Sequence, residues 1–472
     1  MRILPSFLLL LFPAAALAQP VLTQHPELAA LAAQVSADRE RATDTRLVAF
    51  GTRHTLSDVN SDTRGIGAAR RWVQAQFSDM ATSCGGCLEI QTPSGTFTGA
   101  RIPKPSQVMD VLAVQRGTSN AGRVIVISAH VDSINGNVVN GQRYMDAKGD
   151  APGANDDASG VSAVLEAARI LSARKFSATI VYAVLSGEEQ GLFGGKVLAD
   201  YAVAQNWRVE ADLNNDIIGN THGLGGLIDN SHVRVFSEGS RATESADQAR
   251  ARHSEGGEND SPSRNLARFM QGLADAYING FSVRPIYRPD RFRRGGDHLE
   301  MLAQGFPAVR VTEAAENYTR QHQTVRVENG IAYGDVLEGV DFDYLAQVTR
   351  LNVITLAALA LAPAPPEGVT IAGAVTPDTV LSWKPAADAA LHRLWWRDTT
   401  EPQWHFNRQT GGDSLTLAGI NIDDWFFGVS AVSADGYESP VVYPGASGSF
   451  ARMPPQAAPA PFIPAPAPGP AR

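Results

Sequence analysis

We expect this sequence of 472 residues to lack hydrophobic runs long enough to cross a membrane. A spanning helix needs about 20 apolar residues, whereas the leucine-rich run at the N-terminus covers only residues 3–12. Arg2 before this run and the small-x-small segment 16–18 after it are typical of a cleaved export signal. We therefore expect residues 1–18 to be a signal peptide, with an uncleaved interfacial anchor as the alternative, and a secreted or periplasmic protein without stable membrane insertion.

Cysteine is almost absent, since Cys84 and Cys87 are the only 2 in the chain. Two thiols cannot complete a tetrahedral structural zinc site, which has four ligands. In an exported protein their spacing favours a small local disulfide instead. We expect a disulfide between Cys84 and Cys87 that closes a short loop and contributes about 2 kcal/mol to stability.

An excess of positive charge is lacking too, because 40 Lys and Arg stand against 49 Asp and Glu and leave a formal charge of -9. Nucleic-acid binding needs a basic surface, so we expect no nucleic-acid partner. Hydrophobic residues make up 44% of the chain, which is enough apolar material for a large core. The length exceeds that of a usual single domain, so we expect one large domain and a smaller one.

Hydrophobic periodicity predicts that the large domain, residues 19–361, is α/β. Short β-branched runs at 124–127 and 180–185 are typical of buried parallel strands, and the apolar positions between residues 161 and 171 share one helix face. This βαβ unit predicts a mostly parallel mixed sheet flanked by helices. Further expectations are strands at 227–236 and 308–311, helices within 26–80 and at 266–277 and 343–361, and a solvated loop at 237–264.

A second unit follows an Ala/Pro-rich segment, residues 362–367, which we expect to be a stiff linker. Short alternating runs over residues 368–452 predict a small all-β sandwich. Segments around Trp383 and at 428–439 resemble fibronectin type III modules. We interpret the aromatic residues here as a sandwich core, with a surface or carbohydrate contact as the alternative. The Pro/Ala-rich residues 453–472 are expected to be disordered.

Acidic and histidine side chains cluster around the predicted strands of the large domain. His130 and Asp132 follow the first strand, and Glu188 and Glu189 follow the second. Asp156 precedes the crossover helix, and Asp216 ends a further polar segment. Sites in open parallel sheets lie at the carboxyl ends of the strands, so we expect these side chains to share one crevice.

The residue types in this set indicate a pair of divalent cations. Histidine and carboxylate ligands without thiolates favour zinc with positions open to water. Two ions roughly 3.5–4 Å apart need ligands on each and a carboxylate between them. A further carboxylate must stay free to take a proton from water. The adjacent Glu188 and Glu189 can divide these tasks, because neighbouring residues at a strand end point in different directions.

Together these fragments resemble the bacterial double-zinc aminopeptidases of clan MH, whose relatives include glutamate carboxypeptidases and glutaminyl cyclases. The resemblance covers roughly residues 45–360 and adds His322, in the segment 316–324, as the last ligand. It implies two zinc ions bridged by Asp156, with Glu189 and Asp216 on different ions. We place His130 beside Asp216, and His322 beside Glu189.

The resemblance also implies roles for two carboxylates that are not ligands. Glu188 would be the general base, and Asp132 would orient His130. Family members carry a tyrosine immediately before the last histidine as an oxyanion donor, but this chain has Gln321 there, and Tyr318 is the candidate donor.

A further departure from the family pattern concerns its Ser-Asp-His fragment. Here it reads Gly296-Asp297-His298, which we interpret as a pocket wall or as a support behind the ligands.

The expected activity is that of a metallo-exopeptidase that removes amino acids from peptides with a free N-terminus. Carboxypeptidase, glutaminyl cyclase and a catalytically silent binding protein are the alternatives. Four arginines before Asp297 are interpreted as a solvated loop, with recognition of a substrate carboxylate as the alternative that would favour a carboxypeptidase. They are Arg288, Arg291, Arg293 and Arg294.

Overall fold

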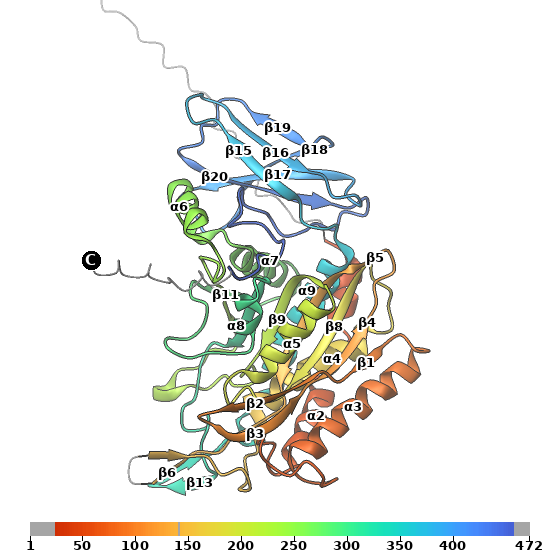
Figure 1. Cartoon of the computed structure of the whole chain (residues 1–472), viewed down its shortest axis with the longest axis vertical. Helices are drawn as coiled ribbons and strands as arrows, with labels where there is room; N and C mark the ends of the chain where they lie inside the picture. Colours follow the sequence, from red (N-terminus) through yellow and green to blue (C-terminus); the bar gives the residue numbers. More distant parts are fainter. Residues whose placement is uncertain (1–23, 140–141, 457–472) are drawn as a thin grey trace, which may run out of the picture.

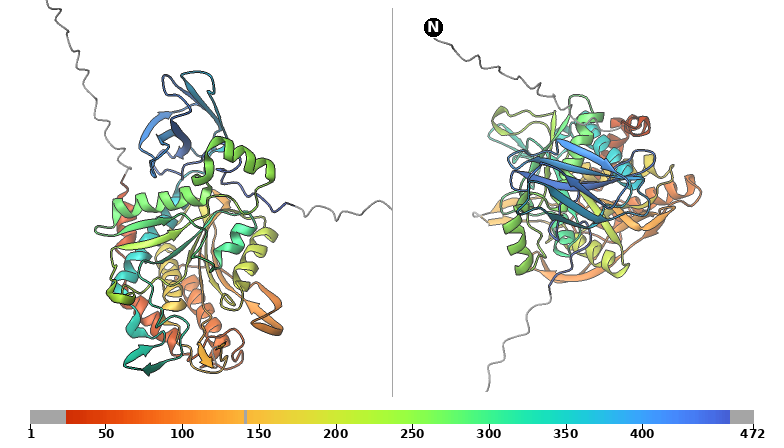
Figure 2. Two further views of the ribbon diagram at one scale, coloured as in Figure 1. Left: turned by 90° about the vertical axis from the view of Figure 1, so that its left-hand side faces the viewer. Right: turned by 90° about the horizontal axis from the view of Figure 1, so that it is seen from above.

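The structure is a computed structural model that describes residues 24–139 and 142–456 of the chain (Figure 1). The expected signal peptide, residues 1–18, and residues 457–472 of the expected tail lie outside the described residues. The larger part of the molecule is built on one central sheet, and a smaller part made of two three-stranded sheets lies at one end of it (Figures 1 and 2).

The central sheet has eight strands in the order β1-β4-β8-β5-β9-β12-β10-β11. Strands β8, β5, β9 and β12 run parallel, β10 and β11 are parallel to each other, and the pairs β1–β4, β4–β8 and β12–β10 are antiparallel. The expected mostly parallel mixed sheet is therefore confirmed. Along the chain its strands are β1 Glu89–Gln91, β4 Val111–Gln115, β5 Asn120–His130, β8 Ala178–Leu185, β9 Arg208–Asn215, β10 His232–Phe236, β11 Ser282–Ile286 and β12 Ala308–Glu313.

Both faces of the sheet are covered, which explains why its strands read as continuous apolar runs. Side chains alternate between the faces of a strand, so in β5 Ile125 and Ile127 join the core on one face and Val124 and Val126 join the core on the other. The first face carries most helices: α1 Pro26–Ala32, α2 Ala37–Val48, α3 Gly65–Ser83, α4 Ser159–Leu171, α7 Pro262–Tyr277 and α9 Phe342–Leu361. The second carries α5 Phe193–Ala204 and α8 His298–Ala303.

Three local expectations differ from the structure. The segment 237–264 is not a solvated loop, because it contains α6 Ala246–Glu255, and its Asp260 is fully buried. The residues of α6 itself are not buried, whereas Asp260 is buried where its carboxylate binds Arg397 of the smaller part of the molecule. The strand expected at 227–236 begins only at His232, and the helices expected within 26–80 are interrupted by turns.

Helix α9 is long and apolar enough to cross a membrane by composition, so the expectation that no later segment has these properties is wrong. However, 83% of its most apolar window is buried inside the protein. Its apolar side chains pack around α1, α2 and α4 rather than facing outward. Its composition is therefore that of a central core helix.

The smaller part consists of two three-stranded antiparallel sheets around a core that includes Leu381, Trp396 and Phe427. One sheet has the order β15-β16-β19 and the other β18-β17-β20, with bounds β15 Glu367–Ala372, β16 Thr379–Lys384, β17 Leu391–Asp398, β18 Phe406–Thr410, β19 Ser414–Leu417 and β20 Trp425–Val432. Met453 N donates to Gly305 O over 3.1 Å, so the chain beyond residue 452 begins against the large domain. The likeness to fibronectin type III modules stays a prediction.

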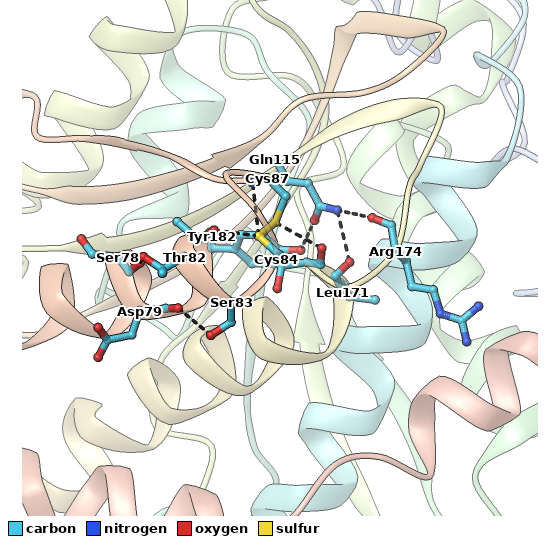
Figure 3. Close-up of a disulfide and its surroundings, with 12 residues drawn as sticks. Ser78, Asp79, Thr82, Ser83, Cys84, Cys87, Gln115, Leu171, Arg174 and Tyr182 are labelled. Carbon is cyan, nitrogen blue, oxygen red and sulfur yellow. Dashed lines mark hydrogen bonds between the residues drawn. A yellow bond between two sulfur atoms is a disulfide. The ribbon is translucent and has the colours of Figure 1, made fainter.

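The disulfide joins Cys84 and Cys87 in the turn that ends α3 (Figure 3). Beside it, Gln115 Nε2 donates to the carbonyl oxygens of Leu171 and Arg174 over 3.2 and 2.6 Å, and Tyr182 donates to Gln115 Oε1 over 2.8 Å. The turn that carries the disulfide therefore lies beside the C-terminal end of α4, where Gln115 binds the carbonyl oxygens.

Small hairpins complete the description. They are β2 Ser94–Gly99 with β3 Ile102–Met109, β6 Asn137–Val139 with β7 Gln142–Tyr144, and β13 Arg326–Glu328 with β14 Ile331–Tyr333. The β6 and β13 hairpins lie at the end of the molecule opposite the two small sheets (Figure 1).

Candidate metal centre

Three of the five expected metal ligands lie at or just after the carboxyl ends of parallel strands, and the other two lie in loops that follow such strands. His130 is the last residue of β5, Asp216 follows β9 directly, and Glu189 lies in the loop after β8. Asp156 lies in the turn that precedes α4, and His322 lies in the loop between β12 and β13. The four loops converge because neighbouring parallel strands end at the same edge of the sheet.

The structure brings these side chains together as two trios that share Asp156. In each trio the ligand atoms all lie within 4.8 Å of one another: His130, Asp156 and Asp216 in one, and Asp156, Glu189 and His322 in the other. Asp156 Oδ1 lies 3.2 Å from His130 Nε2, and its Oδ2 lies 2.9 Å from His322 Nε2. The two oxygens of one carboxylate therefore face different trios.

The donor set fits zinc. Imidazole nitrogens and carboxylate oxygens are ordinary zinc ligands. His130 Nε2 is buried, and its neighbours are carboxylate oxygens that offer it no hydrogen bond of good geometry in the described part of the chain. Burial alone would lower the pKa of His130, but Asp132, Asp156 and Asp216 raise that pKa well above its usual value. The same negative potential attracts a cation.

Asp132 is fully buried behind the centre and holds two of its parts in place. Its carboxylate accepts the backbone N–H groups of Glu188 and Glu189, each over 3.2 Å, and the hydroxyl of Thr55. His130 Nδ1 lies 3.0 Å from the carbonyl oxygen of Asp132 and 3.5 Å from its Oδ1. Asp132 therefore positions the loop after β8 as well as the imidazole, which is more than the sequence predicted.

Asp335, which the sequence did not single out, holds the turn that carries Asp156. Its two carboxylate oxygens accept the backbone N–H groups of Asn155 and Asp156 over 2.9 and 2.7 Å. Asp157 caps the start of α4, because its carboxylate accepts a hydrogen bond from Gly160 N over 3.0 Å. It also accepts a hydrogen bond from the backbone N–H of His130. No periodicity or spacing around Asp335 marks it as a partner of a residue 179 positions away.

Comparisons with known proteins place this chain in one family. The sequence model of Peptidase family M28 matches residues 110–326. A probable zinc metalloprotease of Pyrenophora tritici-repentis is 41% identical over 424 residues, which cover 89% of this chain and 86% of the relative. The chain belongs to peptidase family M28. It is a zinc metallopeptidase, as the resemblance implied, although this relative comes from a fungus rather than a bacterium.

Solved structures agree with the fold of the M28 peptidase. LapB of Legionella pneumophila is similar with a TM-score of 0.52 and 19% identity, over 73% of this chain and 78% of LapB. The LapA aminopeptidase of the same organism has a TM-score of 0.51 and 20% identity, over 73% of this chain and 76% of LapA. At these identities the two likenesses concern the fold.

Glu188 in the M28 peptidase lies beside the centre but belongs to neither trio. Its side chain is half-buried and accepts no hydrogen bond in the described part of the chain. Burial raises the pKa of Glu188 well above its usual value, His130 opposes this shift, and the carboxylates of Asp216 and Glu189 add to it. The structure thus leaves this carboxylate free to exchange a proton.

Arg310 on β12 is a part of the site that sequence reasoning missed. It is fully buried, and its Nη2 lies 2.7 Å from Oδ1 of Asp216. Its Nη1 donates to Gly295 O over 2.8 Å and lies 3.4 Å from Asp290 Oδ2. One signal was present, since Arg310 is a single charge between apolar residues in a strand expected to be buried.

The remaining candidates are placed away from the ligand atoms. Tyr318, the candidate oxyanion donor, has a side chain that is 57% exposed, and no hydrogen bond in the described part ties its hydroxyl to the trios. Asp297 accepts from Gly195 N over 2.8 Å, and burial raises its pKa to about 8. His298 Nε2 lies 2.8 Å from the carbonyl oxygen of Pro289. The fragment 296–298 supports the surrounding loops.

Proposed function

We propose that this M28 peptidase is an aminopeptidase that binds two zinc ions and acts on peptides with a free N-terminus. The observation that carries the proposal is the shared carboxylate of Asp156, whose oxygens lie 3.2 and 2.9 Å from His130 and His322. A carboxylate between two sets of ligands is what a pair of divalent cations needs.

Zinc ions held by these residues would lower the pKa of water and polarise a carbonyl oxygen, which is the chemistry of peptide hydrolysis. Glu188 does the proton transfer, because its carboxylate lies at the centre without being part of either trio. It takes a proton from the attacking water and returns it to the departing amine. Asp132 keeps Glu188 and His130 aligned through the contacts described above.

The carboxylates of the site suit the ammonium group of a free N-terminus. Glu188 belongs to neither trio, so it keeps a carboxylate beside the centre for that cation when zinc neutralises the ligand carboxylates. Acetylation of the substrate removes that charge, so N-acetylated peptides should be poor substrates. The resemblance of the ligand fragments to the double-zinc aminopeptidases points the same way.

Glu188→Gln tests the proposal most directly. The amide keeps the size of the side chain but cannot accept the proton, so kcat should fall by at least about 10²-fold while the zinc content stays at two ions per chain. Metal analysis and hydrolysis of a panel of aminoacyl chromogenic amides measure both. Glu189→Gln is the matched control, since it removes a ligand and should lower the zinc content as well as the activity.

The same panel separates the alternatives. Cleavage of N-acetylated peptides but not of free ones would contradict aminopeptidase action and favour a carboxypeptidase. Ammonia release from an N-terminal glutamine would favour a glutaminyl cyclase. An unchanged function after Glu188→Gln would favour a binding protein.

We also propose that the protein is exported through the signal expected at residues 1–18. The disulfide of Cys84 and Cys87 supports this, because such bonds persist in oxidising compartments. N-terminal sequencing of the protein recovered outside the cytoplasm tests the proposal, and the expected first residue is Gln19. A mature chain that still begins at Met1 would contradict it.

A further inference from the structure

A continuous set of arginines runs along one side of the metal centre, and it starts at Asp216. Arg310 Nη2 lies 2.7 Å from Asp216 Oδ1. The carbonyl oxygen of Gly295 accepts from both Arg310 Nη1, over 2.8 Å, and Arg291 Nη2, over 3.1 Å. Two guanidinium groups therefore meet at one carbonyl, a short distance behind a metal ligand.

The set ends beside the other trio. Glu316 lies among three guanidinium groups, with Oε2 2.9 Å from Arg294 and 3.7 Å from Arg291, and Oε1 2.5 Å from Arg234. Arg294 Nη2 also donates to Gln321 Oε1 over 3.4 Å. Gln321 is the neighbour of the ligand His322 in the sequence. We call Arg234, Arg291, Arg294 and Arg310 the arginine wall.

The arginine wall has more positive than negative charge. Its ion-pair partners are Asp216, Asp290 and Glu316, so four cations face three anions and one positive charge remains. The side chain of Arg291 is 8% exposed, and its Nη1 has no hydrogen-bond partner in the described part of the chain. Burial and then the nearby Arg310 lower the pKa of Arg291, whereas Asp216 and Asp290 oppose this shift.

The loop before Asp297 is therefore not solvated as a whole. Arg288 and Arg293 are exposed, and their guanidinium carbons lie 5.5 and 5.2 Å from the ring centre of Phe292. Arg291 instead contacts Asp290 and Glu316, and Arg294 contacts Glu316. The expectation of a solvated loop is wrong for Arg291, because Asp290 and Glu316 bind its buried side chain.

We propose that the arginine wall binds a carboxylate of the substrate next to the scissile bond, through Arg294 and Arg291. Arg294 is reachable, since its side chain is 32% exposed, and the fork of a guanidinium matches a carboxylate with two parallel hydrogen bonds. The carboxylate can be the side chain of an N-terminal Glu or Asp, or the C-terminus of a short peptide. This inference rests on the proposed function for the position of the substrate.

Binding measurements test the inference without depending on turnover. The zinc-loaded Glu188→Gln protein is titrated calorimetrically with Glu-Ala-amide and Gln-Ala-amide, which differ in the N-terminal side chain, and with Ala-Ala and Ala-Ala-amide, which differ at the C-terminus. We expect the carboxylate member of one pair to bind at least about tenfold more tightly, with a difference that shrinks at high salt. The pair that shows the difference identifies the source of the carboxylate.

Arg294→Gln in the same background should reduce that difference to less than about threefold, and Arg294→Lys should keep part of it because a lysine retains the charge without the fork. Arg293→Gln is the matched control, as an exposed arginine of the same loop, and should leave the difference unchanged. Equal binding within both pairs would overturn the inference. The inference would also be overturned if Arg294→Gln lowered the affinity for neutral and acidic ligands equally.

A failure of the proposed aminopeptidase function would give a different result from a failure of carboxylate binding by the arginine wall. If the wild-type protein cleaves no free peptide although its zinc is bound, the aminopeptidase proposal fails, whereas the calorimetric comparison still decides whether a carboxylate is recognised.

Discussion

Arg310 Nη2 lies 2.7 Å from Oδ1 of Asp216, and both side chains are buried at the back of the metal centre. Burial would raise the pKa of Asp216, but Arg310 is the first of the groups that lower it below its usual value. The pair keeps a metal ligand ionised inside the protein. It also makes the stability of the protein depend on the cations around Asp216.

Arg310→Met should destabilise the metal-free protein by about 3–5 kcal/mol, because it leaves the Asp216 carboxylate buried without its partner. Bound zinc neutralises the same carboxylate, so the loss should be smaller in the zinc-loaded protein. Denaturant unfolding with and without zinc measures the two values. The control Arg293→Gln should change stability by less than about 0.5 kcal/mol. Equal losses in both states would contradict the link between Arg310 and the metal site.

Removal of metal by a chelator should abolish hydrolysis and lower the melting temperature. Zinc binds the folded chain and not the unfolded one, so free zinc at about 1,000 times its Kd stabilises the protein by about 4 kcal/mol. Calorimetry before and after chelation measures this shift. Zinc should restore both activity and melting temperature, and calcium should not, since the imidazole ligands do not suit it. Full activity in the chelator would contradict a metal-dependent reaction.

Glu40 should make the protein less stable as the pH rises from about 4.5 to 8. Burial in α2 raises its pKa from 4.5 to about 8, and Thr349 lowers it by a smaller amount. Between these values the unfolded chain loses the proton and the folded chain keeps it, so unfolding becomes easier. The linked free energy is at most about 4–5 kcal/mol.

Glu40→Gln removes this titration and should make the unfolding free energy depend less steeply on pH between 5 and 8. Asp212 and Asp335, whose pKa burial raises to about 7, should keep part of the slope. Unfolding in urea at several pH values measures the change. Asp38→Asn, an exposed carboxylate of the same helix, is the control and should keep the wild-type slope. A slope that Glu40→Gln leaves unchanged would show that Glu40 does not cause it.

Asp260 should hold the two parts of the molecule together. It is fully buried, and its carboxylate lies 3.0 Å from Arg268 of α7 and 2.8 Å from Arg397 of β17. Asp260→Asn leaves two buried guanidinium groups without an anion, which costs about 3–5 kcal/mol. Calorimetry should show one cooperative transition in the wild type and an earlier transition of the small sheets in the variant. Asp247→Asn on the exposed face of α6 is the control.

Periodicity was enough to predict the elements that are buried on both sides. The runs at 124–127 and 180–185 became β5 and β8, which pair in parallel, because only an apolar strand is stable between two layers of helices. The same reasoning failed at 237–264. Polar residues there are buried because Asp260 meets Arg397, more than a hundred positions further along the chain, and no local pattern reports such a partner.

Residue types around predicted strand ends marked His130, Asp156, Glu189 and Asp216 in the sequence, and the family resemblance added His322; the structure brings all five together. The residues that hold these ligands in place could not be predicted from the sequence. Asp335 reaches the backbone of Asp156, and Arg310 reaches Asp216, only after β9, β12 and the intervening loops have packed. Such contacts join residues far apart in the chain, so folding alone determines which buried charge meets which partner.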